Sequence, residues 1–193
     1  MPVIRRYFQA AKTAAVLIAL LIVSAQARQQ PDKPAIQIQN FGCVNEKLYR
    51  GAQPKATDYA SLAALGIKTV IDLQREGEAD EQQLVEDAGM KFFRIGMSDR
   101  SRPAPGQADE FFSIISDPAN QPVFVHCHGG RHRTGVLIAL YRITREGWTA
   151  ERAYEEMKQY QFAKGIGHGA LKQYVFDYYA QMEQKNSADR SAR

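Results

Sequence analysis

A cysteine and an arginine separated by five residues are the groups in this 193-residue chain best suited to covalent chemistry. They are Cys127 and Arg133, and the stretch between them reads His-Gly-Gly-Arg-His. A loop of this length lets successive backbone N–H groups surround one anion, while the arginine offers a planar fork to two of its oxygens. The same positive field favours the thiolate, which is the form that attacks. The spacing therefore predicts a phosphate-binding loop with a nucleophile at its floor.

The residues on either side of this loop predict a strand before it and a helix after it. The apolar run 122–125 leads into the cysteine, and the apolar stretch 136–141 follows the arginine. A helix that begins at the arginine would add the positive end of its dipole to the anion site. Gly129, Gly130 and Gly135 suit a backbone that turns sharply and approaches a ligand closely. We therefore expect the order strand, loop, helix.

The stretch 126–135 resembles the signature of the protein-tyrosine-phosphatase superfamily, which is His-Cys-x5-Arg-Thr/Ser-Gly. Its closer form, Cys-x-x-Gly-Arg/Lys-His-Arg-Thr-Gly, is similar to that of the plant and fungal atypical dual-specificity phosphatases. The segment 40–54, which contains Asn-Phe-Gly-Cys-Val and Leu-Tyr-Arg-Gly, resembles the leading segment of the same group. The resemblance covers residues 40–179. It implies a phosphocysteine intermediate and no metal or other cofactor.

Three other interpretations of the loop fit its residues less well. A buried turn with an incidental cysteine would not require the joint spacing of Cys, Gly and Arg-Thr-Gly. A sulfur-transferring loop of the rhodanese type would be one residue shorter, which suits a sulfur atom rather than a phosphate. A metal site would need side chains that point to opposite faces of a strand to converge. The residues of that metal site would be His126, Cys127, His128 and His132.

Phosphoryl transfer also needs an acid that protonates the leaving oxygen. Asp99 is our candidate because it lies in the turn-rich loop 96–106, directly after a predicted strand. Proline and glycine residues give this loop the composition of a movable segment. The alternative is an ordinary loop aspartate that pairs with Arg100 or Arg102. Other acidic residues suit a helix N-terminus or a strand end better: Asp109, Glu110 and Asp72.

The remaining residues of the signature are predicted to bind substrate or to support the loop. His126 is expected to orient the cysteine loop through hydrogen bonds, and Thr134 to bond the thiolate and assist breakdown of the phosphocysteine. In inositol-phosphate-directed relatives, basic residues at the positions of His128 and Arg131 add charge for a highly phosphorylated substrate. The alternative is that these side chains are merely solvated. The predicted substrate-binding residues are His128, Gly129, Gly130, Arg131, His132 and Thr134.

Two residues further along the chain, Lys164 and His168, either reach the mouth of the same loop or belong only to a turn. Both lie in a glycine-rich stretch before the last predicted helix.

The net charge of +4 does not indicate a nucleic-acid-binding protein. Residues 1–27 hold three of the 25 basic residues and no acidic one, which leaves 22 basic against 21 acidic residues. Residues 1–27 also have the basic, apolar and small-residue order of a secretory signal peptide with cleavage after Ala27. Their apolar run, from Ala14 to Val23, is short for a membrane span, which favours a cleaved signal peptide. An uncleaved membrane anchor is the alternative. We expect a periplasmic or secreted protein that meets the membrane only through this leader.

Only two cysteines occur, Cys43 and Cys127. A permanent disulfide would inactivate the nucleophile, so we expect Cys43 to be a small buried hydrophobic residue. A reversible bridge that protects the thiolate from over-oxidation is the alternative.

Beyond the leader, the chain predicts a linker at 28–40, one phosphatase domain at 41–183 and a disordered tail at 184–193. Thr57 and Thr149 are expected to cap helices. Strands and helices alternate, which predicts an α/β fold with a mostly parallel sheet covered on both faces. The predicted strands are 46–49, 67–73, 90–95 and 122–126. The predicted helices follow Thr57, span 80–88, 108–116 and 134–146, follow Thr149, and span 170–182.

The resemblance implies a dual-specificity phosphatase that acts on phosphotyrosine proteins and on phosphoserine or phosphothreonine proteins. An inositol phosphate or inositol pyrophosphate is the alternative substrate. From a different class of function, a phosphate-binding module that has lost catalysis is the second alternative.

Overall fold

The structure, a computed structural model, describes residues 35–162 and 167–192. The predicted signal peptide, most of the predicted linker and Lys164 lie outside these residues, and they stay predictions. Among the described residues, none of the helices combines the length and the apolar character that crossing a membrane requires.

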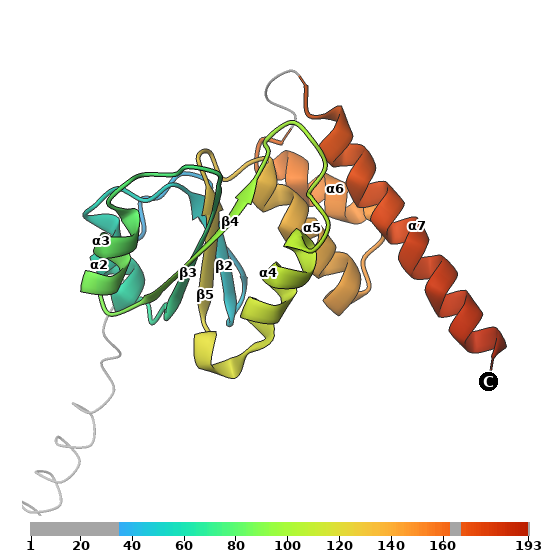
Figure 1. Cartoon of the computed structure of the whole chain (residues 1–193), viewed down its shortest axis with the longest axis horizontal. Helices are drawn as coiled ribbons and strands as arrows, with labels where there is room; N and C mark the ends of the chain where they lie inside the picture. Colours follow the sequence, from blue (N-terminus) through green and yellow to red (C-terminus); the bar gives the residue numbers. More distant parts are fainter. Residues whose placement is uncertain (1–34, 163–166, 193) are drawn as a thin grey trace, which may run out of the picture. The chain divides into compact units, whose positions relative to one another are not determined.

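A five-stranded sheet with the order β1-β2-β5-β3-β4 forms the centre of the fold (Figure 1). Only the pair β1–β2 is antiparallel; the other three neighbouring pairs are parallel, as the alternation of elements predicts. The two strands of the antiparallel pair replace the single first strand that we expected. The strands are β1 (Gly42–Asn45), β2 (Leu48–Ala52), β3 (Thr69–Gln74), β4 (Lys91–Met97) and β5 (Val123–Cys127).

The helices cover both faces of this sheet (Figure 1). Helices α2 and α3 pack on one face, and α4 to α7 lie on the other. The structure therefore confirms the predicted sheet with helices on both faces. Because β5 is buried on both faces, its sequence is apolar without alternation. The helices are α2 (Asp58–Ala64), α3 (Glu81–Asp87), α4 (Gln107–Ser116), α5 (Arg133–Glu146), α6 (Ala150–Gln159) and α7 (Gly169–Ser191).

The pleat of β5 sends its side chains into two separate apolar cores. Val125 and Cys127 lie in the core beneath α5, whereas Phe124 lies in the core beneath α2 and α3. The ring of His126 stacks on Phe124, which places it on the side of α2 and α3. Successive residues of a strand point to opposite faces, so the nucleophile and the histidine before it are separated by the sheet.

Cys43 is exposed, which corrects the expectation of a buried residue. It lies on β1, the edge strand, whose only pairing is with β2. Its thiol donates a hydrogen bond to the carbonyl of Asn45 at 3.2 Å. Both cysteines are free in the structure, and Cys127 is the buried one.

The ends of the domain extend further than the sequence predicts. Ile38, assigned to the linker, is buried in the core beneath α2 and α3, and the carbonyl of Gln39 accepts the N–H of Ala52 at 2.8 Å. At the other end, α7 continues to Ser191 through the residues expected to be disordered. Those residues are exposed, but half of those in the helix favour it and none is glycine or proline, which agrees with the continuation.

One prediction concerns the two threonine caps, of which the structure shows a hydrogen bond at only one. The hydroxyl of Thr149 accepts the N–H of Arg152 at 3.3 Å, whereas Thr57 has helical backbone angles and makes no such bond. Thr149→Ala should therefore lower the free energy of unfolding by about 1 kcal/mol, measured by urea denaturation. Thr57→Ala is the matched control and should change it by only a few tenths. Equal losses in both variants would show that the hydroxyl bond contributes nothing.

Candidate active site

The predicted phosphate loop joins the central strand to the most buried helix. Strand β5 ends at Cys127 and α5 begins at Arg133, so the five residues between them form the loop. Strands β2 and β3 flank β5 in parallel, and Ala52 of β2 lies opposite Cys127. The loop thus lies at the carboxyl edge of the parallel strands, where open α/β sheets bind their ligands.

Three successive carbonyls of the loop are held from outside by the segment 40–53. Because a trans peptide directs its C=O and the next N–H to opposite sides, the N–H groups that follow these carbonyls turn away from the segment. This orientation gives the loop the converging amides that an anion site requires. The bonds are His128 C=O to the Gln53 N–H (3.2 Å), Gly129 C=O to Asn40 Nδ2 (2.7 Å) and Gly130 C=O to Arg50 Nη2 (2.8 Å).

Gly130 is the position in the loop that requires glycine. Its φ of 64° lies in the left-handed region, and a Cβ there would come within 2.5 Å of the backbone of Gly51. The loop and β2 therefore pack backbone to backbone, with no room for a side chain between them.

The nucleophile and its neighbours on α5 are close to fully buried. Cys127 is 3% exposed, and Thr134 is buried with a hydroxyl that has no hydrogen-bond partner among the described residues. Thr134 therefore makes no bond to the thiol in this structure, although it lies in the first turn of α5. Arg133 donates from Nη1 to the carbonyl of Leu73 at 3.4 Å, and its Nε has no partner in the described part of the chain.

Asp99 shares a cavity of about 340 Å³ with Arg133. The side chain of Asp99 is exposed, and Arg102, one of the two cations suggested as its partner, pairs instead with Asp177 of α7. The structure thus places the candidate acid in the same cavity as the signature arginine. Sequence reasoning missed Arg75, an exposed cation on the same wall. The cavity is lined by Gln74, Arg75, Glu76, Gly77, Met97, Ser98, Asp99 and Arg133.

The rim residues differ in how firmly they are held. His128 is exposed, whereas Arg131 is half-buried beside Gly129, with an Nε that has no hydrogen-bond partner in the described ranges. His132 contacts the carbonyl of Phe162 at 3.0 Å, and its ring stacks on His168 with centroids 3.5 Å apart. His132 is therefore held by its neighbours, whereas His128 is open to solvent.

His168 reaches the mouth of the loop, which was one of the two expectations for it. Its Nδ1 lies 2.9 Å from the backbone carbonyl of Asp99, while its ring covers His132. The residue therefore links the loop that carries the candidate acid to the rim of the cradle. Its predicted companion, Lys164, lies outside the described residues.

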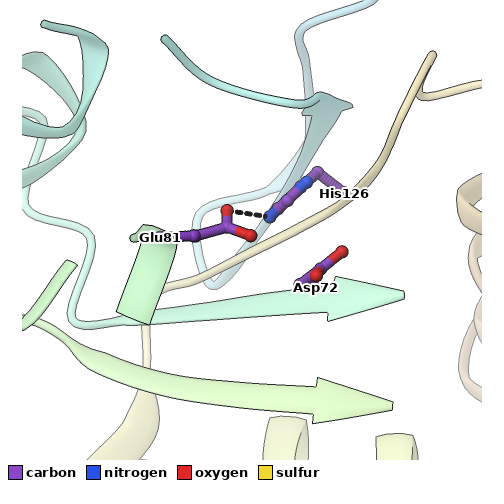
Figure 2. A group of neighbouring side chains, drawn as sticks. All are labelled: Asp72, Glu81 and His126. Atoms are coloured by element: carbon purple, nitrogen blue, oxygen red, sulfur yellow. Dashed lines mark ion pairs between the residues drawn. The ribbon is translucent and has the colours of Figure 1, made fainter. Parts of the chain in front are cut away.

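His126 does not orient the loop as expected, because it faces the other side of the sheet. Its Nε2 lies 2.8 Å from Oε1 of Glu81 on α3, and both side chains are fully buried (Figure 2). The loop is oriented instead by Asn40, Arg50 and Gln53. The sequence contains one signal of this support: Arg50 is a charged residue within β2, whose other residues are uncharged.

Asp72, Glu81 and His126 form a buried cluster whose ligand atoms lie within 4.8 Å of one another, which would suit a metal ion (Figure 2). Most of their polar atoms, however, already have protein partners; among the described residues, His126 Nδ1 and Glu81 Oε2 have no hydrogen-bond partner. Asp72 accepts from Arg94 Nε at 2.9 Å, and Arg94 also lies 3.8 Å from Glu81. Glu81 accepts from Tyr59 and from Gln53, each at 2.8 Å. We interpret the cluster as a network that fastens α3 to the sheet, which agrees with the structural role expected of Asp72.

The protonation of this network follows from its geometry. Burial raises the pKa of Glu81, but the bonds from His126, Tyr59 and Gln53 outweigh burial and hold the pKa below its usual value. Burial and the adjacent carboxylate raise the pKa of Tyr59, so its hydroxyl stays a donor. Glu81 is therefore an ionised acceptor and does not supply a proton.

Comparisons with known proteins agree with this geometry. The chain is 28% identical over 166 residues to inositol diphosphatase SIW14 of Saccharomyces cerevisiae, which covers 83% of this chain but 58% of the yeast protein. It is 30% identical over 130 residues to "Probable tyrosine-protein phosphatase DG1060" of Dictyostelium discoideum, which covers 65% of this chain and 78% of that protein. This chain thus spans about six tenths of the yeast relative.

Solved structures share the fold. The core catalytic domain of the PP-IP phosphatase SIW14 from S. cerevisiae superposes with a TM-score of 0.67 at 24% identity, over 82% of this chain and 96% of that one. TpbA of P. aeruginosa superposes with a TM-score of 0.62 at 25% identity, over 78% and 94%. A model of the tyrosine phosphatase family matches residues 35–192, which include the sheet, the loop and every described helix. The chain therefore belongs to the tyrosine phosphatase family.

Proposed function

We propose that the chain is a phosphatase that hydrolyses phosphomonoesters through a phosphocysteine intermediate. The observation that carries this proposal is the outward binding of three loop carbonyls, which leaves the loop amides to face a phosphate above Cys127. Membership of the tyrosine phosphatase family supports the same chemistry.

The residues divide the first step of the reaction between them. The Cys127 thiolate attacks phosphorus, a sulfur–phosphorus bond forms, and the bond from phosphorus to the ester oxygen breaks. Arg133 and the loop amides hold the three remaining oxygens, whose charge is largest in the transition state. Asp99, which lines the cavity beside Arg133, gives its proton to the leaving oxygen.

The second step regenerates the enzyme. Water attacks the phosphocysteine, Asp99 as carboxylate accepts a proton from that water, and the thiolate leaves as phosphate is released. Thr134 is buried in the first turn of α5, and its hydroxyl has no hydrogen-bond partner in the described part of the chain, which suits a donor to the departing thiolate. This residue therefore assists the second step more than the first.

The substrate has two candidates. A phosphotyrosine protein presents one phosphate and a ring, in agreement with the name of the Dictyostelium relative. An inositol phosphate or pyrophosphate presents several phosphates, in agreement with the name of the yeast relative. The cations outside the loop floor favour the second candidate, because Arg75 lines the cavity and the Nε of Arg131 has no hydrogen-bond partner among the described residues. One phosphate already satisfies Arg133 and the amides.

The first prediction here tests the nucleophile. Cys127→Ser should abolish turnover yet retain binding of phosphate analogues, because the loop amides and Arg133 remain. Mass spectrometry after a rapid acid quench should find phosphate on Cys127 of the wild type, and EDTA should leave its activity unchanged. Cys43→Ser is the matched control, since this thiol is exposed and free, and it should be fully active. An active Cys127→Ser variant would refute the covalent mechanism, and an inactive wild type would favour the phosphate-binding module.

A further prediction tests the acid. Asp99→Asn should slow alkyl phosphates, whose leaving groups are poor, by roughly 10²–10⁴-fold, and aryl phosphates with good leaving groups much less. The fall in rate on the alkaline side of the pH profile should flatten, because the group that loses its proton there is gone. Asp109→Asn, in the first turn of α4, is the control and should behave as wild type. An equal loss on both substrates would assign the acid to another residue.

The substrate prediction concerns the rim. Arg131→Ala should raise KM for an inositol polyphosphate roughly tenfold, and KM for an aryl phosphate far less, because only the first can engage a second cation. Added salt should shrink the difference, since partly exposed charges are screened. Arg152→Ala, which removes a cation stacked on Trp148, is the control and should leave both KM values unchanged. If Arg131→Ala impairs both substrates equally, the residue only shapes the loop and the phosphoprotein substrate is favoured.

A further inference from the structure

Arg50 carries a positive charge that is buried directly behind the phosphate loop. Arg50 is 1% exposed, and it is one of the largest fully buried side chains among the described residues. It lies on β2 opposite Val125, two residues before the pairing of Ala52 with Cys127. Burying a charge is costly unless another group compensates it, so the partners of this guanidinium matter.

Those partners leave the charge of Arg50 largely uncompensated. Nη2 donates to the carbonyl of Gly130 at 2.8 Å, and the guanidinium lies 3.7 Å above the ring of Tyr160. Nε and Nη1 have no hydrogen-bond partner, and no carboxylate forms an ion pair with Arg50, within the residues that the structure describes. Every other buried ionised side chain described above has an oppositely charged neighbour.

Arg50 and Cys127 lie on the same side of the sheet, because Arg50 pairs with Val125, and Val125 and Cys127 point into the same core beneath α5. Burial lowers the pKa of Arg50 to about 10, and the pKa falls no further because Tyr160, Glu156 and Cys127 favour the cation. Arg50 is therefore charged at neutral pH. A buried positive charge on the nucleophile's side of the sheet, bonded to the same loop, is placed to favour a negative sulfur at Cys127.

We propose that Arg50 is a positioning residue of the active site, which stabilises the Cys127 thiolate from behind the loop and holds the Gly130 carbonyl outward. It is buried and does not line the cavity that Arg133 lines, so we assign it no contact with substrate. The two arginines thus divide the work: Arg133 meets the phosphate, while Arg50 prepares the nucleophile before substrate arrives. The inference rests on the thiolate mechanism proposed above.

The test separates the charge of Arg50 from its hydrogen bond. Arg50→Gln keeps a donor for Gly130 but loses the charge, whereas Arg50→Lys keeps the charge and loses the planar fork. The readout is the pH midpoint of Cys127 alkylation by iodoacetamide, followed by mass spectrometry on folded protein without substrate. The midpoint should rise by about one pH unit in Arg50→Gln. At a pH below both midpoints, the variant would then hold roughly one tenth of the thiolate that the wild type holds. In Arg50→Lys it should stay near the wild-type value while KM for an aryl phosphate rises, because loop geometry alone is disturbed.

Arg94→Met is the matched control. This variant also removes a partly buried arginine, one that pairs with Asp72 and Glu81 across the sheet from Cys127, so it should lower stability and leave the midpoint unchanged. A wild-type midpoint in folded Arg50→Gln, or equal shifts in Gln and Lys variants, would overturn the inference. If the Gln variant does not fold, the Lys variant decides, since a full-unit shift there excludes a role for the charge. Alkylation does not depend on turnover, so an inactive wild type with a shifted Arg50→Gln midpoint would refute the proposed function and not this inference.

Discussion

The binding of the loop carbonyls by the segment 40–53 is the constraint on which the site depends. A phosphate loop must turn its amides inward, and it can do so only if the carbonyls of the same peptides find partners on the outside. Asn40, Arg50 and Gln53 supply those partners before any ligand binds. The amides are thus preorganised, which is the condition under which fixed dipoles stabilise transition-state charge most effectively.

The pleat of β5 divides the polar chemistry of the domain into two compartments. Cys127 faces α5 and the phosphate loop, while His126 faces Glu81 in a network that also holds Tyr59. The acidic network therefore lies across the sheet from the nucleophile and belongs to the packing of α3. On the nucleophile's side, two arginines flank the loop, Arg133 from the cavity and Arg50 from behind, and they supply the positive field that a thiolate needs.

The parts of the site that the sequence predicts are those that neighbouring residues determine. The strand, loop and helix from Val123 to Glu146 follow from a contiguous pattern, and the structure confirms their order. The loop's supports could not be found this way, because Asn40 and Arg50 reach it across 89 and 80 residues of chain. The same limit explains Cys43, since an edge strand and a central strand have similar composition until their pairing is known.

The outer rim of the site is built on a different physical principle from its floor. The floor consists of buried backbone held by hydrogen bonds, whereas the candidate acid Asp99 is an exposed loop residue. Apart from the buried Pro103 and the bond that Gln107 donates to the Gly96 carbonyl, the contacts of that loop lie at the surface: His168 binds its backbone, and Arg102 pairs with Asp177 on α7. Exposed contacts of this kind are individually weak, so the loop can change position at little cost while the floor cannot. A rigid cradle beside an adjustable acid loop is what two-step phosphoryl transfer requires, because the acid must serve first a departing oxygen and then an arriving water.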